Sequence, residues 1–206
     1  MNNIVAVTIG DINGIGLRIL IESFKDKKIK NFILFSNKKI IQRYINKENI
    51  KIRLNIISNQ NIKNNFDNKK FNLYSYNCKS LEDNTLKSLK YAYDFCKKKL
   101  CMGMITLPLR KDLIKKKIDN KFIGHTEFFQ KIDKKEFSNM ILYHNKIIIS
   151  PLTTHVELRK ISKLISNKRL IYNQVINLNN TLKIDFNIKK PRIVISGLNP
   201  HAGENG

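Results

Sequence analysis

The sequence predicts an α/β fold built around a mostly parallel β-sheet. Short apolar runs rich in valine and isoleucine alternate with segments in which apolar residues recur every three or four positions. The first pattern is typical of buried strands and the second of amphipathic helices, and their alternation favours βαβ connections. With 206 residues, of which 42% are hydrophobic, the chain is long enough for one sizeable domain or two small ones.

The first quarter of the chain reads as strand, helix, strand, helix, strand. The first strand is predicted at 3–10, a short run that contains β-branched residues. Apolar residues at helical spacing follow at 17–25, and the second strand is expected at 31–37. The segment 38–48 has the spacing of a second helix, and a third strand is expected at 52–58.

The same alternation continues through the middle of the chain. A polar, asparagine-rich segment at 59–70 is expected to be a loop, with a further strand at 72–77. The clearest amphipathic pattern of the whole chain predicts a helix at 84–100. A strand at 102–108 that ends at a proline and a helix at 110–118 complete this part.

The last third is predicted to be mixed. A helix is expected at 125–132, with Thr126 as its N-cap, and a hairpin or two edge strands at 139–150. Helices at 155–165 and 168–182 precede a last strand at 191–197. There is no internal repeat and no proline- or glycine-rich linker, so composition predicts no domain boundary.

The net charge of +23 raises the possibility of a nucleic-acid partner. Only seven of the 39 basic residues are arginine, the side chain best suited to phosphate and base recognition. The lysines are spread along the whole chain without interleaved aromatic residues. We therefore interpret them as solvated surface and expect no nucleic-acid partner, with a basic DNA-binding domain as the alternative.

Other compositional features predict a cytoplasmic protein without a membrane partner. The chain has no apolar run of the length that a transmembrane helix needs. Its start lacks the basic region of a signal peptide and reads as a strand. The three cysteines form no CxxC pair, so free thiols in a reducing compartment are expected.

Polar and glycine-containing turns follow four of the predicted strands. Open parallel sheets bind ligands at the carboxyl ends of their strands, so these turns are the candidate site. The turns lie at 9–16, 107–111, 151–155 and 197–206. The first contains Gly10, Gly14 and Gly16, whose spacing matches neither dinucleotide nor P-loop fingerprints and indicates a tight turn with positive φ.

Histidines provide the candidate chemistry. His155 and His201 each follow a predicted strand and could supply two of the three protein ligands of a catalytic divalent metal, although a structural role is the alternative. His144 lies in the predicted hairpin turn and is expected to be solvated. His125 and Thr126 lie at a predicted helix N-terminus, where a phosphate or carboxylate would bind, and a simple cap by Thr126 is the alternative.

Five segments, in order, resemble the 4-hydroxythreonine-4-phosphate dehydrogenase family of vitamin B6 biosynthesis. They are "TIGDINGIG", "TLPLRK", "GHTEFF", "TTHVELRKI" and "SGLNPHAGENG". The resemblance implies a three-layer α/β/α fold like that of the isocitrate and isopropylmalate dehydrogenases. It implies two interleaved α/β lobes within residues 1–206, and a C-terminal portion of the family that lies beyond this chain.

The resemblance also implies the activity. The family oxidises 4-phosphooxy-L-threonine with NAD or NADP, and the 2-amino-3-oxo acid formed decarboxylates to 3-amino-2-oxopropyl phosphate. A divalent metal (zinc, magnesium or cobalt) is held by three histidines, two of which fall on His155 and His201, with the third expected outside this chain. The substrate-binding pair falls on His125 and Thr126, and a homodimer with its active site at the subunit interface is implied. Lys111 matches a lysine of the family to which no role is assigned.

Two departures and three alternatives accompany this assignment. Ile9, Ile12 and Leu17 stand where family members usually have prolines, which puts the rigidity of the first turn in question. The other departure is the portion of the family that this chain lacks. A dehydrogenase of a phosphorylated four-carbon sugar acid, a catalytically incomplete fragment and one subunit of a split protein are the alternatives.

Overall fold

The structure is a computed structural model that describes residues 3–57, 65–154, 156–199 and 201. The chain divides into two compact units, Met1–Phe129 and Gln130–Gly206. We describe each unit by itself.

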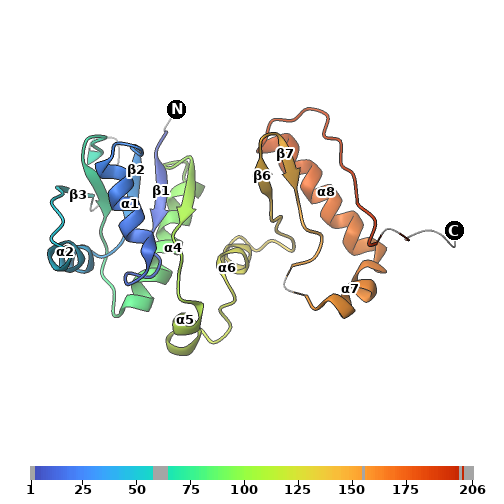
Figure 1. The fold of residues 1–206 in the computed structure, drawn as a ribbon, viewed down its shortest axis with the longest axis horizontal. Helices are drawn as coiled ribbons and strands as arrows, with labels where there is room; N and C mark the ends of the chain where they lie inside the picture. Colours follow the sequence, from blue (N-terminus) through green and yellow to red (C-terminus); the bar gives the residue numbers. More distant parts are fainter. Residues whose placement is uncertain (1–2, 58–64, 155, 200, 202–206) are drawn as a thin grey trace. The chain divides into compact units, whose positions relative to one another are not determined.

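The first unit contains a five-stranded parallel sheet in the order β3-β4-β2-β1-β5 (Figure 1). The strands are β1 (Val5–Thr8), β2 (Phe32–Phe35), β3 (Leu54–Ile57), β4 (Phe71–Tyr74) and β5 (Gly103–Thr106). The helices are α1 (Ile15–Lys25), α2 (Lys38–Lys47), α4 (Leu81–Lys97), α5 (Lys111–Lys117) and α6 (His125–Ile132), whose last residues belong to the second unit. The predicted α/β class with a parallel sheet is confirmed.

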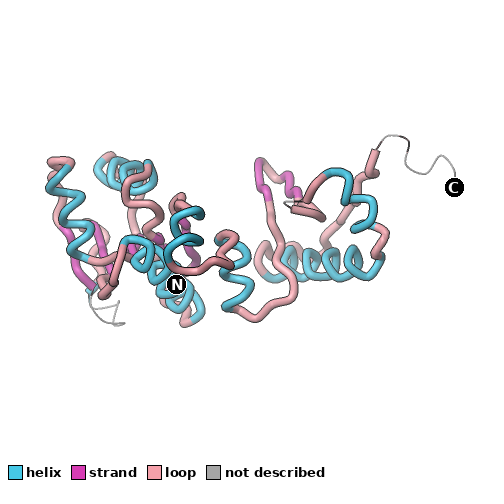
Figure 2. The backbone as a smooth tube through the Cα atoms, turned by 90° about the horizontal axis from the view of Figure 1, so that it is seen from below, coloured by secondary structure: helices cyan, strands magenta, loops and turns pink. Residues whose placement is uncertain are grey.

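Helices cover both faces of this sheet, which makes three layers (Figures 1 and 2). On one face, Leu17 and Ile21 of α1 and Ile41 of α2 pack with alternate strand residues such as Leu34. On the other face, Phe95 of α4 packs with the intervening strand residues. Helices α1 and α2 carry the chain from β1 toward β3, whereas α4 carries it back past β1 to β5. Right-handed crossovers that run in opposite directions place their helices on opposite faces, which explains the layers.

The strands of the first unit are buried because both faces are covered. All four residues of β2 and of β4 are buried, as the unbroken apolar run "FILF" requires in a central parallel strand. Strand β5 lies at an edge, and Ile105 is 56% exposed there. Helix α4 begins at Leu81, three residues before the predicted start, because the Ser80 hydroxyl caps it by accepting a hydrogen bond from the Asp83 backbone N–H.

The second unit contains a hairpin and two helices (Figure 2). Strands β6 (Leu142–His144) and β7 (Ile147–Ile149) pair in antiparallel fashion, and the helices are α7 (Leu158–Ile165) and α8 (Lys168–Ile184). The hairpin turn uses positive φ angles at Asn145 and Lys146, as two-residue hairpin turns require. The prediction of a hairpin at 139–150 is confirmed.

The prediction of a last strand at 191–197 is wrong. Residues 191–197 form neither strand nor helix, and the Val194 side chain is 90% exposed. A β-branched run becomes a strand only where a neighbouring strand accepts and donates its backbone hydrogen bonds. The described part of the chain offers this segment no such neighbour.

No helix in the described part of the chain combines the length and the apolar character that crossing a bilayer requires. The three cysteines carry free thiols, as predicted. Burial raises the pKa of Cys101 to about 12, so this thiol is an apolar core side chain rather than a nucleophile.

Candidate functional site

The carboxyl ends of β1 and β5 form the topological switch point of the sheet. The two strands are parallel neighbours, with Thr8 opposite Thr106. The turns that follow them are joined by a hydrogen bond of 2.8 Å from the Asp11 backbone N–H to the Pro108 carbonyl. From α4, the Thr85 hydroxyl donates to the Gly10 carbonyl at 3.0 Å. The prediction that these two turns follow the carboxyl ends of parallel strands is confirmed. Ligands of open α/β sheets bind at such points, so the two turns stay the candidate site.

The other two predicted turns do not follow strands of the parallel sheet. The turn at 151–155 follows β7, which belongs to the antiparallel hairpin of the second unit. The turn at 197–206 follows the segment that is not a strand. An apolar run shows that a segment is fit to be a strand, but not which sheet it joins.

At Gly10 a side chain is excluded by lack of space rather than by backbone angle. None of Gly10, Gly14 and Gly16 has a φ in the left-handed region, so the predicted need for positive φ is wrong. A Cβ on Gly10 would lie 2.0 Å from the Pro108 carbonyl oxygen, and one on Gly16 would lie 3.0 Å from Leu107 Cβ. The turn is thus packed directly against the β5–α5 connection.

The three residues that stand where family members usually have prolines are packed in or against the core. Ile9 and Leu17 are each 1% exposed in the core cluster beneath α1, and Ile12 packs against that cluster. Apolar packing therefore holds this turn. Because the Pro108 backbone fills the space beside Gly10, we do not assign the turn to the pyrophosphate of a dinucleotide.

Helix α6 presents His125 at its N-terminus. The helix begins at His125, so Thr126 lies exposed in the first turn and is not the N-cap; the prediction that it caps the helix is wrong. The first N–H to be paired is that of Phe128, which donates to the Gly124 carbonyl at 3.1 Å. The sequence pattern does not distinguish a helix that starts at His125 from one that starts after Thr126, because helix ends shift by a residue or two.

The His125 imidazole is partly buried, and its Nε2 atom is shielded from solvent. The described residues offer Nε2 no hydrogen-bond partner. Burial lowers the pKa of His125, the nearby Lys111 ammonium lowers it further, and the Glu127 carboxylate opposes both. The imidazole is therefore neutral at neutral pH, and a buried ring nitrogen is left for a ligand to pair with.

The stability of the folded chain is expected to fall in mild acid because of His125. Its folded-state pKa lies below the ordinary value of 6.5. The unfolded chain therefore takes up a proton at a higher pH than the folded chain. The free energy of unfolding should decrease as pH falls below about 6.5, and this contribution should level off below the folded-state pKa.

Denaturant unfolding of wild-type and His125→Gln chains at several pH values between about 8 and 5 checks this expectation. The glutamine variant should lose less stability across the interval than the wild type. His144→Gln, in the exposed hairpin strand β6, is the matched control. Equal pH dependence in all three proteins would contradict the assignment.

The predicted metal histidines are only partly described. His155 lies outside the described residues. His201 is exposed, and its backbone N–H donates to the Asn199 side-chain oxygen at 3.0 Å. Within the part of the chain that the structure describes, no three His, Cys, Asp or Glu side chains gather as metal ligands would. His155 and His201 as metal ligands thus stay a prediction.

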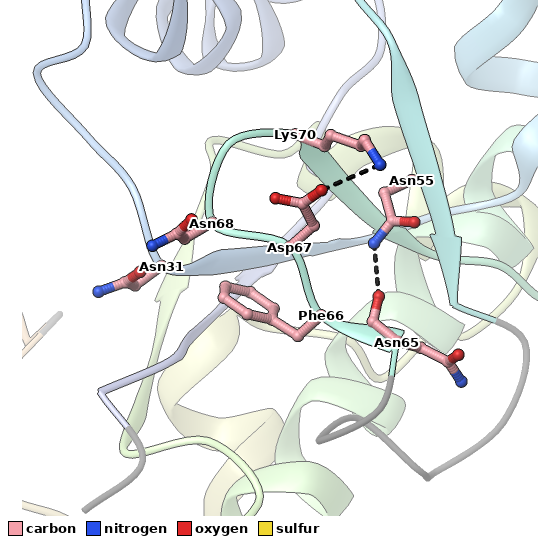
Figure 3. Close-up of a pocket in the computed structure, with 7 residues that line it drawn as sticks. All are labelled: Asn31, Asn55, Asn65, Phe66, Asp67, Asn68 and Lys70. Atoms are coloured by element: carbon pink, nitrogen blue, oxygen red, sulfur yellow. Dashed lines mark hydrogen bonds and ion pairs between the residues drawn. The ribbon is translucent and has the colours of Figure 1, made fainter.

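A pocket of about 640 Å³ lies at the opposite, amino end of the strands (Figure 3). Its lining is polar apart from Phe66: Asn31, Asn55, Asn65, Phe66, Asp67, Asn68 and Lys70. Several of the polar groups pair with one another: Lys70 pairs with Asp67 at 2.9 Å, and the Asn55 amide donates to the Asn65 carbonyl at 2.6 Å (Figure 3). We assign this pocket no role in the candidate site.

Sequence reasoning missed the polar side chains that hold the switch point together. Asn84 is 2% exposed and donates to the Ser36 hydroxyl at 3.0 Å, while its side-chain oxygen accepts from the Asn37 N–H at 2.9 Å. Together with Thr85, this side chain ties the start of α4 to the ends of β1 and β2. Residues almost fifty positions apart give no local signal of such a pairing.

Comparisons with known proteins agree with this geometry. The sequence profile of the family described as "Pyridoxal phosphate biosynthetic protein PdxA" matches residues 28–206. The 4-hydroxythreonine-4-phosphate dehydrogenase of Bacteroides thetaiotaomicron is 28% identical over 98% of this chain and 58% of the relative. That of Wigglesworthia glossinidia brevipalpis is 34% identical over 91% of this chain and 53% of the relative.

The fold itself also has a solved counterpart. The structure of a 4-hydroxythreonine-4-phosphate dehydrogenase from Klebsiella pneumoniae superposes with a TM-score of 0.82 at 24% identity, covering 98% of this chain and 66% of that one. The chain spans between half and two thirds of the length of these proteins. The three-layer α/β/α fold is thereby confirmed. On the match over residues 28–206, the chain belongs to the pyridoxal phosphate biosynthetic protein PdxA family.

Proposed function

We propose that this chain contributes to an NAD- or NADP-dependent, divalent-metal-dependent dehydrogenase. Its substrate would be 4-phosphooxy-L-threonine, oxidised to the 2-amino-3-oxo acid, which loses carbon dioxide to give 3-amino-2-oxopropyl phosphate. Membership of the family and the names of the relatives support this reaction in pyridoxal phosphate biosynthesis. The observation that carries it to this chain is the solvent-shielded, unpartnered Nε2 of His125 at the start of α6.

The substrate-binding role is proposed for His125 and Thr126. The first N–H groups of a helix and its dipole favour an anion, and such a contact contributes about 0.3–1 kcal/mol or more. The Thr126 hydroxyl is exposed in the same turn and can donate to an anion's oxygen. The neutral His125 imidazole can share a hydrogen bond through Nε2. Together these groups would hold and orient the phosphorylated end of the substrate.

The metal-binding role is proposed for His155 and His201. Two neutral imidazoles suit zinc or cobalt better than magnesium, which prefers oxygen ligands. When bound, a divalent metal supplies Lewis acidity to a substrate hydroxyl and a nicotinamide accepts the hydride. We assign no residue of this chain to the nicotinamide.

A homodimer with a shared active site is part of the proposal. The hairpin of the second unit exposes Leu142, Tyr143, Ile147 and Ile149, each more than half exposed. Apolar side chains gathered on one short hairpin support a protein partner. Sedimentation velocity would test it, and a strictly monomeric chain at high concentration would count against it.

Metal binding provides the sharpest test of the proposal on this chain. Cobalt(II) titrated into the wild-type chain should produce absorption bands of a nitrogen-ligated ion. The His155→Ala, His201→Ala double variant should lose them, whereas His144→Ala should retain them, because His144 is exposed in β6. Retention of the cobalt bands by the double variant would overturn the ligand assignment.

Turnover is tested separately, by NAD or NADP reduction with 4-phosphooxy-L-threonine and added zinc, cobalt or magnesium. A phosphorylated four-carbon sugar acid serves as the competing substrate. Reduction only with the sugar acid would overturn the proposed substrate. Retention on DNA that falls with salt would support the nucleic-acid alternative instead.

A further inference from the structure

Lys111 brings a positive charge to the N-terminal end of α6. Lys111 is the first residue of α5 and the last residue of the turn that begins at Leu107. Its Nζ lies 3.2 Å, and its Cε 3.4 Å, from the point that a Cβ on Gly124 would occupy. Gly124 directly precedes the first residue of α6. The absence of a side chain at Gly124 therefore leaves the space into which the lysine head group reaches.

This ammonium has no ion-pair partner among the described residues, unlike Arg110 before it and Lys117 at the end of α5. Lys117 at the other end of the helix pairs with Glu82 at 2.7 Å, and Arg110 pairs with Asp112 at 2.6 Å. Lys111 instead faces the start of α6, where the described residues offer no partner to the N–H groups of residues 125–127. A lysine charge and a helix N-terminus repel each other unless an anion lies between them.

Glu127 shows where such an anion would lie. Its Oε2 is 3.1 Å from the same point beside Gly124 as the Lys111 ammonium. The two side chains are close but do not form an ion pair within 4.0 Å. A carboxylate that belongs to the first turn of the helix thus takes the position that suits an incoming anion.

We propose that Lys111 is a binding residue of the candidate site, and that it pairs with the phosphate of the substrate at the N-terminus of α6. The inference rests on the proposed function and deepens it. A phosphate monoester carries close to two negative charges, which a lysine and a helix N-terminus match better than either does alone. Because His125 is neutral, Lys111 supplies the full positive charge of the site. Glu127 competes with the phosphate and is displaced when it binds.

The effect of Lys111 is measured with inorganic phosphate as the probe, titrated into the full 206-residue chain at low salt. Lys111→Met should raise the phosphate dissociation constant by about tenfold or more, the loss expected for one charge-assisted hydrogen bond. Lys111→Arg should recover much of the affinity. Lys116→Met removes the same charge from an exposed position on the same helix and should change the affinity little.

One further variant and one further readout on Lys111→Met also have predictable outcomes. Glu127→Gln removes the competing carboxylate and should tighten phosphate binding. In Lys111→Met, the NMR titration of the His125 imidazole should show a higher pKa, because the lysine charge that lowers it is gone. This second readout does not depend on phosphate.

The outcomes separate the inference from the proposed function. Phosphate binding that is weakened by His125→Gln and Thr126→Ala, but equally strong in Lys111→Met and Lys116→Met, overturns the role of Lys111 and leaves the proposed site standing. A folded wild-type chain that binds no phosphate overturns both.

Discussion

Replacing Gly10 with alanine is expected to destabilise the first unit by about 3 kcal/mol or more. The new Cβ would lie 2.0 Å from the Pro108 carbonyl oxygen and 2.7 Å from that of Leu107. Both obstructing atoms belong to the backbone, so no side-chain rotation can relieve the overlap. Either β1 and β5 must separate at their carboxyl ends, or the β5–α5 connection must move.

Gly103→Ala is the matched control for this prediction. A Cβ at Gly103 meets nothing within 4 Å, although this residue begins β5, the strand that leads into the connection against which Gly10 packs. The free energy of unfolding of the Gly103→Ala variant should differ from that of the wild type by no more than about 0.5 kcal/mol. Denaturant unfolding followed by circular dichroism measures both variants, and equal midpoints would refute the packing of the two turns.

The Gly10 contact also has a functional consequence. The Asp11–Pro108 hydrogen bond joins the first turn to the connection that leads into Lys111. A shift of this connection would move the lysine away from the start of α6. Gly10→Ala is therefore expected to weaken phosphate binding even where the chain remains folded.

Replacing Phe35 with alanine is the second change with a large expected effect, a loss of about 3–5 kcal/mol in the free energy of unfolding. Phe35 is 0% exposed in the core between the sheet and α4. Its ring centroid lies 4.9 Å from that of Phe95 and 5.3 Å from that of Tyr74. Removal of the ring leaves a cavity between the sheet and α4, and neither the sheet nor the helix can move far enough to fill it.

Phe35→Leu gives a graded comparison at the same position. Leucine keeps most of the buried apolar surface, so its cost should be about 1–1.5 kcal/mol. Unfolding in urea at one pH measures both variants against the wild type. A similar loss in the two variants would show that burial of the ring does not determine the stability of this layer.

The local sequence pattern was sufficient to predict most helices and strands of the first unit. The strands β1, β2 and β3 and the helices α1, α2, α5 and α6 fall within or close to their predicted ranges. Their apolar periods match the surfaces that they bury, so the signal is contained in a few consecutive residues. The histidine at the start of α6 was predicted in the same way, from the segment "GHTEFF".

Prediction from the sequence failed where a structural feature depends on contacts with residues far away in the chain. The run at 191–197 has the composition of a strand, yet it has no neighbour with which to pair in the described chain. Gly10 carries no sign that the Pro108 carbonyl takes the place of its side chain. Lys111 matched a lysine of the family but had no assigned role until the fold placed it beside Gly124.

The amino-acid sequence was thus sufficient to predict the α/β class, the parallel sheet and the candidate anion-binding turn, because periodicity and short motifs are local properties. The tertiary structure alone decided which turns meet at the sheet edge, why the glycines are needed and which lysine faces His125. Each of these depends on a contact between residues far apart in the chain, and such contacts form only when the strands and helices pack.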